Sequence, residues 1–83
     1  MANIRYPESG SALRAARRSR LPSISQERLA EAVGITRRHM IRLENGEHRP
    51  SGDLRDKIAV ELGVDPSALP AEEGHADPFR DAA

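Results

Sequence analysis

The centre of the chain contains two short amphipathic helical patterns that are separated by only three residues. The first runs from Gln26 to Val33 behind Ser25, a residue type that caps helices, and the second follows Thr36. Gly34 stands directly after the first pattern, where a left-handed backbone geometry suits glycine. Two helices joined by so short a turn cross steeply and pack through small residues. The sequence therefore predicts a helix pair at the centre of the fold.

Further helices are predicted on both sides of this pair. Ser11 is expected to cap a first helix that Pro22 interrupts. Ser51 is expected to cap a fourth helix, whose apolar stripe recurs every four residues at Leu54, Ile58 and Leu62. Asp65-Pro66 is typical of the start of a short fifth helix. No strand-like alternation and no internal repeat occurs, so the expected fold class is all-α.

The chain divides into three predicted regions. Residues 1–10 have no hydrophobic period and are expected to form a flexible N-terminal arm. Residues 11–70 hold the five helical patterns and are expected to form one compact domain. Residues 71–83 consist largely of acidic residues, alanine, glycine and proline, and are expected to be a disordered acidic tail. A domain this small buries about two-thirds of its unfolded surface, so no deep cavity is expected.

The formal net charge of zero conceals an asymmetry between the two halves of the chain. Residues 1–50 carry ten arginines and five acidic residues, a balance of +5. Residues 51–83 carry three basic and eight acidic residues, a balance of −5. Uneven charge of this kind indicates an anionic partner for the basic half. The alternative, that these charges only solvate helix faces, remains open at this point.

Several function classes find no support in the sequence. There is no cysteine, and the three histidines, His39, His48 and His75, have no metal-ligand spacing. No phosphate-binding glycine loop and no catalytic combination of side chains is present, so we expect no enzyme, no cofactor and no metal. No apolar run approaches the roughly 18 residues of a membrane span, and the N-terminus has no apolar signal core. A soluble cytoplasmic protein is therefore expected.

Four motifs follow one another at defined spacings: Ser25-Gln26-Glu27-x-Leu29-Ala30, Gly34-Ile35-Thr36, Leu43-Glu44-Asn45-Gly46 with Arg49-Pro50, and Ala59-x-x-Leu62-Gly63-Val64. In this order they resemble the lambda-repressor-like helix-turn-helix family, which includes the phage Cro proteins and the Xre-type bacterial regulators. The resemblance covers about Leu13 to Leu69. It implies a compact five-helix DNA-binding domain that places a recognition helix, about Thr36 to Asn45, in the major groove of double-stranded DNA.

The resemblance also implies which residues read DNA bases. The matching positions are Thr36, Arg37, Arg38 and Arg42. An arginine fork can bond both O6 and N7 of guanine, so we hypothesise a half-site that contains G/C pairs. The alternative is that some of these arginines contact phosphates or are only solvated. For Ile41, contact with a thymine methyl group, packing against the loop at residues 21–24 and simple exposure all remain open.

Other matching positions imply backbone contacts and one structural pair. Gln26 begins a helix, where the helix dipole favours a DNA phosphate. Asn45 and Arg49 match further phosphate-contacting positions, although Asn45 is equally suited to end the helix. Arg17 and Glu44 match a pair that orients helices in the family. Three more arginines are expected to be solvated, with phosphate contact as the alternative: Arg14, Arg18 and Arg20.

One departure from the family lies between the first two helices, where residues 20–26 are about two residues longer than is usual. This leaves the end of the first helix, and any contact from Arg20, undetermined. The expected function is a sequence-specific transcriptional regulator, of the repressor or Cro type or a host or restriction-modification regulator. It is expected to bind a pseudo-palindrome as a homodimer, through a region around the fourth and fifth helices. The alternative is an antitoxin-type or other protein-interaction module that uses the acidic C-terminal half to bind a protein partner.

Overall fold

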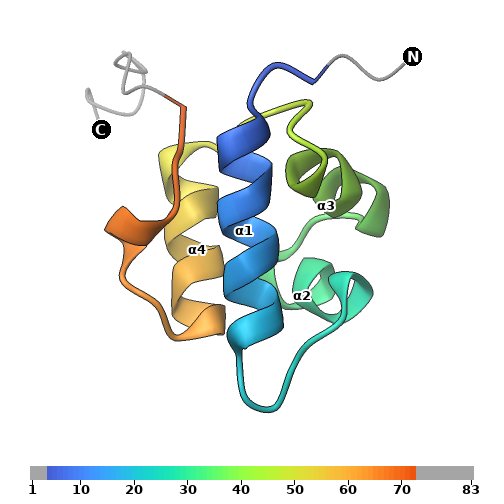
Figure 1. The fold of residues 1–83 in the computed structure, drawn as a ribbon. Helices are drawn as coiled ribbons and strands as arrows, with labels where there is room; N and C mark the ends of the chain where they lie inside the picture. Colours follow the sequence, from blue (N-terminus) through green and yellow to red (C-terminus); the bar gives the residue numbers. More distant parts are fainter. Residues whose placement is uncertain (1–3, 73–83) are drawn as a thin grey trace, which may run out of the picture.

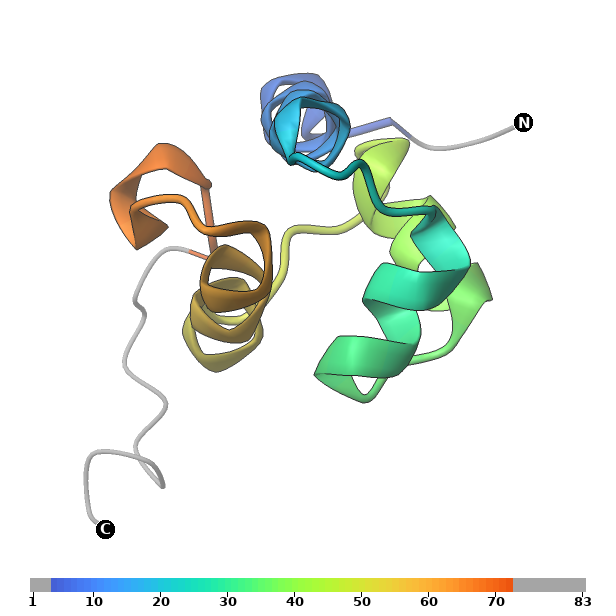
Figure 2. The ribbon, with the colours of Figure 1, turned by 90° about the horizontal axis from the view of Figure 1, so that it is seen from below.

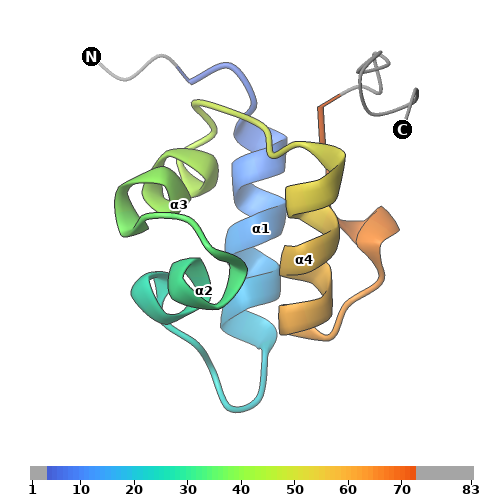
Figure 3. The same cartoon turned by 180° about the vertical axis from the view of Figure 1, so that it is seen from behind.

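The computed structural model describes residues 4–72 as four α-helices followed by one short 3-10 helix (Figure 1). The elements are α1 (Pro7–Ser19), α2 (Gln26–Val33), α3 (Arg37–Glu44), α4 (Gly52–Leu62) and η1 (Pro66–Ala68). No strand occurs within this range, so the predicted all-α class is confirmed. The pair α2–α3 lies on one side of α1 and α4 lies on the other, as Figures 1 and 3 show from opposite sides. Figure 2 shows α1 nearly end-on above the two groups.

Three helices begin at the caps that the sequence predicts. The hydroxyls of Ser25, Thr36 and Ser51 accept hydrogen bonds from the backbone N–H three residues later, at 3.1, 3.0 and 3.2 Å. Each bond satisfies one of the donors that a helix leaves unpaired at its N-terminus. Gly34 ends α2 and Gly63 ends α4, both in left-handed geometry with φ of 84° and 71°. Local signals therefore determine where α2, α3 and α4 begin.

The core is aliphatic and draws on all four α-helices. Its buried side chains are Leu13, Leu29, Ala30, Val33, Met40, Leu43, Ile58, Ala59, Leu62 and Leu69. Met40 and Leu43 are fully buried and anchor α3 in the core. Ile35, between α2 and α3, and Leu54, on α4, are partly buried against the same cluster. Because α3 is held by one apolar side, its opposite side faces outward.

The first helix starts earlier than predicted. It begins at Pro7, so the expected cap at Ser11 is wrong, and so is the expected arm for residues 7–10. Proline suits the first helical position, because its φ is already helical and it has no N–H to leave unpaired. The segment before it is also anchored: the backbone N–H groups of Arg5 and Tyr6 both donate to the carbonyl of Gly46, at 3.0 and 2.8 Å. Residues 1–3 lie outside the described range.

The predicted fifth helix is only the 3-10 helix η1, so the count of five α-helices is wrong for the described residues. Asp65 caps it and accepts hydrogen bonds from the backbone N–H and the hydroxyl of Ser67, which lower the pKa of the Asp65 carboxyl. The short run from Pro66 to Leu69 buries only Leu69, which is too little to support a longer helix. Most of the predicted acidic tail, residues 73–83, lies outside the described range. None of the helices within residues 4–72 is long and apolar enough to cross a membrane.

Gly10 allows α1 and the end of α3 to approach one another closely. A Cβ atom at this position would lie 2.8 Å from the backbone nitrogen of Gly46 and still closer to the carbonyl oxygen of Glu44. Both obstacles are backbone atoms, so neither can rotate away. Only glycine fits without a movement of α1 away from α3.

We expect Gly10→Ala to lower the free energy of unfolding by about 2 kcal/mol, because the overlap with backbone atoms costs about 3 kcal/mol, the upper end of the usual range for overpacking. This outweighs the roughly 1 kcal/mol by which alanine normally stabilises a helix relative to glycine. Urea unfolding followed by far-ultraviolet circular dichroism measures the change. Ser11→Ala, at an exposed position next along α1, is the control and is expected to change stability by less than about 0.5 kcal/mol. A Gly10→Ala variant as stable as the wild type would contradict the close approach.

Candidate nucleic-acid interface

The outward side of α3 is strongly basic. Arg37, Arg38 and Arg42 are all exposed, and their side chains form no hydrogen bond or ion pair with another residue within residues 4–72. Met40 and Leu43, which are buried in the core, hold the opposite side of this helix in place. A row of unpaired guanidinium groups on a fixed helix can contact an anionic partner without breaking an internal interaction.

Thr36 and Ile41 border this basic side. Thr36 is exposed and caps α3, with its Oγ1 accepting from the backbone N–H of His39. The hydroxyl keeps its own hydrogen, which is free to donate to a ligand. Ile41 is half-buried, so it is not a fully exposed apolar residue.

The last residue of α3, Glu44, places its carboxylate in the interior of the protein. The side chain of Glu44 is fully buried and accepts two hydrogen bonds from Arg17 on α1, one from Nε to Oε2 and one from Nη2 to Oε1 at 3.1 Å. A guanidinium that engages both carboxylate oxygens fixes distance and orientation together. Arg17 also donates to the carbonyl of Ile24, in the loop between α1 and α2, at 3.0 Å. The Arg17–Glu44 pair thus joins α1, α3 and this loop.

Two more side chains belong to this network, and the sequence indicated neither contact. The amide of Gln26 donates to Oε1 of Glu44 at 3.1 Å, although the sequence assigned Gln26 to a DNA phosphate. An amide nitrogen carries two hydrogens, so one remains for a phosphate. Arg14, expected to be solvated, donates to the Glu44 carbonyl at 3.2 Å and lies 3.5 Å from Oε1 of its carboxylate. The contacts of Arg14 join α1 to α3 across 30 positions of sequence, and that of Gln26 joins α2 to α3 across 18, so a local pattern cannot reveal either.

The two other predicted phosphate contacts lie just after α3. Asn45 ends the helix, is exposed, and accepts a long hydrogen bond of 3.5 Å from Arg14. The guanidinium of Arg49 lies 4.5 Å from the centre of the Tyr6 ring, a cation–π arrangement. Its Nε is buried and has no hydrogen-bond partner within residues 4–72. Tyr6 therefore helps to fix where Arg49 points.

Arg20, at the start of the loop between α1 and α2, makes contacts within the protein. Helix α1 ends at Ser19, and Arg20 donates to the carbonyl of Pro22 at 3.3 Å. Arg20 also lies 3.8 Å from the carboxylate of Glu61 on α4. These contacts connect the longer loop to α4, on the side of α1 away from α3.

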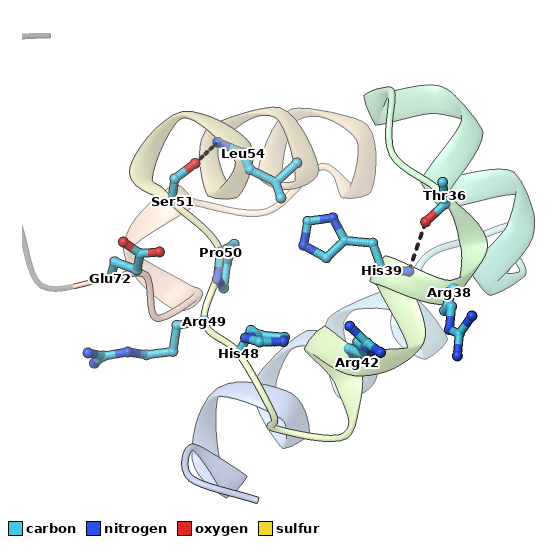
Figure 4. Close-up of a pocket in the computed structure, with 10 residues that line it drawn as sticks. All are labelled: Thr36, Arg38, His39, Arg42, His48, Arg49, Pro50, Ser51, Leu54 and Glu72. Carbon is cyan, nitrogen blue, oxygen red and sulfur yellow. Dashed lines mark hydrogen bonds between the residues drawn. The ribbon is translucent and has the colours of Figure 1, made fainter. Parts of the chain in front are cut away.

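A hollow of about 470 Å³ adjoins the basic side of α3 (Figure 4). Figure 4 shows the rings of His39, on α3, and His48, in the loop before α4, pointing into the hollow, which Arg42 also lines. From the sequence, His39 and His48 were assessed only as possible metal ligands, and no other role was predicted for them. The sequence indicates this position through spacing: His39 stands three residues after Thr36 and three before Arg42, so it neighbours both of them along α3.

Comparison with known proteins adds three findings. Residues 13–69 match the family model for the helix-turn-helix, HTH_3. An uncharacterized HTH-type transcriptional regulator from Methanothermobacter thermautotrophicus is 50% identical over 40 residues, which are 48% of this chain and 58% of that relative. The match thus spans little more than half of the relative's length. The crystal structure of the restriction-modification controller protein C.AhdI from Aeromonas hydrophila is similar, with a TM-score of 0.68 and 30% identity, over 76% of this chain and 88% of the neighbour.

Proposed function

This chain belongs to the helix-turn-helix family HTH_3, and from that membership we propose that it is a sequence-specific, DNA-binding regulator of transcription. In a helix-turn-helix, the second helix of the pair enters the major groove and its first residues reach the base edges. Here that helix is α3. The proposed DNA-binding domain runs from α1 to the end of η1, and the proposal includes no catalytic step.

The observation that carries the proposal is the arginine row on α3. Arg37 and Arg38 occupy the first turn of the helix and Arg42 lies one turn later, all exposed and unpaired within the described residues. We assign base reading to these three arginines and to Thr36. An arginine fork is well matched to guanine, so the proposed half-site contains G/C pairs.

Contacts with the DNA backbone are assigned to residues on either side of α3. Gln26 keeps one amide hydrogen for a phosphate while the other bonds Glu44. Asn45 and Arg49, which follow α3, are assigned to further phosphates of the DNA backbone. Contacts of this kind set the position of the protein on the duplex but do not read its sequence.

The proposal includes a homodimer on a pseudo-palindromic operator. A single module of this size offers few base contacts, and a second copy doubles them. Two large apolar side chains are strongly exposed, Val60 on α4 at 81% and Leu21 in the loop after α1 at 92%. Both border one groove at the ends of α1 and α4, together with Ala16 and Val64. We propose that this groove is part of the surface that the second copy covers. The proposed location of the regulator is the cytoplasm of a bacterial cell or of a phage-infected host.

Selection of bound duplexes from a random DNA pool tests the function. The expected result is an enriched inverted repeat whose half-site centres lie about 10 base pairs, or 34 Å, apart. A single enriched half-site would support DNA reading but contradict the dimer. Binding without any enrichment would contradict sequence-specific regulation, because phosphate contacts alone produce strong, salt-dependent affinity for every sequence.

A further inference from the structure

We propose that His39 and His48 together form a protonation-dependent site for a DNA backbone phosphate, so that operator affinity rises as pH falls. The site is the hollow between α3 and the loop that leads to α4. The inference rests on the proposed function, because it requires that the basic side of α3 face DNA. It adds a contact and a pH response that the helix-turn-helix pattern does not contain.

The first argument is geometric. The two imidazole rings enter the hollow from different elements, His39 from α3 and His48 from the loop, as Figure 4 shows. Both residues are exposed. The same hollow is bordered by Thr36, Arg38 and Arg42, which are assigned to the bases of the operator. A duplex that places its bases against these residues brings its backbone to the edge of α3, where the hollow opens.

The second argument is the charge around the rings. Arg38 and Arg42 border the hollow from α3, and Arg49 borders it from the loop. Helix α4 contributes Leu54 and its cap Ser51, which carry no charge, while Asp53 lies in the first turn outside the hollow. Glu72 is the one carboxylate among the described residues that line it. The surroundings are thus predominantly cationic, which favours an anion over a metal ion.

The third argument is the chemistry of imidazole. A histidine side chain gains its positive charge over the range from about pH 8 to pH 5. Once charged, both ring nitrogens donate, and a charge-assisted bond to phosphate is stronger than a neutral one. Protonation adds two positive charges to a hollow that arginines already border, and a phosphate bound there offsets the added charge. Binding of DNA is therefore coupled to uptake of protons.

The test measures affinity for the enriched operator duplex by fluorescence anisotropy at pH 5.5 and pH 8.0, each over a series of salt concentrations. Wild-type affinity is expected to rise about five-fold per imidazole on acidification, about 25-fold in total, as for unit charges about 4 Å apart in water. Each added cation also steepens the slope of log K against log salt by about 0.9. Circular dichroism at each pH checks that the protein stays folded.

The variants separate the two rings from every other titrating group. His39→Gln/His48→Gln is expected to bind equally at both pH values, apart from any effect of His75 and the N-terminal amine, which it retains. His39→Lys/His48→Lys keeps both charges and is expected to bind at pH 8.0 about as tightly as the wild type at pH 5.5. If the glutamine variant kept the pH response of the wild type, the phosphate site would be wrong, while the proposed function would stand. Absence of sequence-selective binding at either pH would overturn the proposed function, and the inference with it.

Discussion

Replacing Arg17 by methionine is expected to lower the free energy of unfolding by about 3–5 kcal/mol, the usual cost of removing one partner of a buried ion pair. Methionine fills a similar space but leaves the carboxylate of Glu44 buried without its main partner, since that side chain is fully shielded from solvent. Gln26 and Arg14 remain near it and keep the loss toward the lower end of this range. Native domains have a total stability of about 5–15 kcal/mol, so the variant approaches the limit of folding.

Thermal and urea unfolding, followed by far-ultraviolet circular dichroism, measure this loss. For a domain of this size, each kcal/mol corresponds to about 4–8 °C in Tm. The control is Arg18→Met, which makes the same change one residue along α1 at an exposed position. It is expected to stay within about 0.5 kcal/mol of the wild type.

A double variant distinguishes the loss of a partner from the loss of packing. In Arg17→Met/Glu44→Leu the unpaired charge is gone, and much of the lost stability is expected to return, because apolar residues of similar volume can replace a buried pair. If Arg17→Met were no less stable than Arg18→Met, then Glu44 would not depend on Arg17. If the double variant were no more stable than Arg17→Met, the cost would come from packing and not from charge.

The second large effect is expected at the DNA. Replacing any one of Arg37, Arg38 and Arg42 by alanine is expected to weaken operator binding by about 1–3 kcal/mol, roughly 5- to 150-fold. The triple variant is expected to bind the operator no better than unrelated DNA, because specific binding exceeds non-specific binding by only about 10³–10⁷. Fluorescence anisotropy with operator and scrambled duplexes gives both affinities.

Two control variants separate base reading from simple attraction. Arg38→Lys keeps the charge but loses the planar fork, so it is expected to retain the salt dependence and to bind the operator about 5- to 150-fold more weakly, with binding to the scrambled duplex unchanged. Arg18→Ala removes one charge from α1 and is expected to change operator and scrambled duplexes alike. Equal losses on both duplexes for all three α3 variants would show phosphate contacts instead of base reading.

The sequence predicted those parts of the fold that depend on neighbours along the chain. Ser25, Thr36 and Ser51 cap their helices through bonds to residues three positions away, and such signals are visible in any short stretch. Met40 and Leu43 are buried as their spacing indicates. The start of α1 was missed because Pro7 begins the helix while Tyr6 is held by Gly46, forty positions later.

The candidate site likewise has features that the sequence predicts and features that only the packed structure reveals. The exposure of Arg37, Arg38 and Arg42 follows from the helical period once the buried side of α3 is known. The bond from Gln26 to Glu44 does not follow, since it depends on how α2 and α3 meet. The hollow that His39 shares with His48 depends in turn on the path of the loop between α3 and α4. Helix faces can thus be predicted from the sequence, while contacts between elements require the packed structure.

The most direct test of DNA reading by α3 is to repeat the selection from random DNA with Arg37→Lys, Arg38→Lys and Arg42→Lys beside the wild type. Each variant is expected to lose its preference at one base pair, and to lose it symmetrically in both half-sites, while the remaining positions stay enriched. Lysine keeps the charge, so a shift of this kind reports the loss of the arginine fork. If all three variants enriched the same sequence as the wild type, α3 would not be the element that reads the operator.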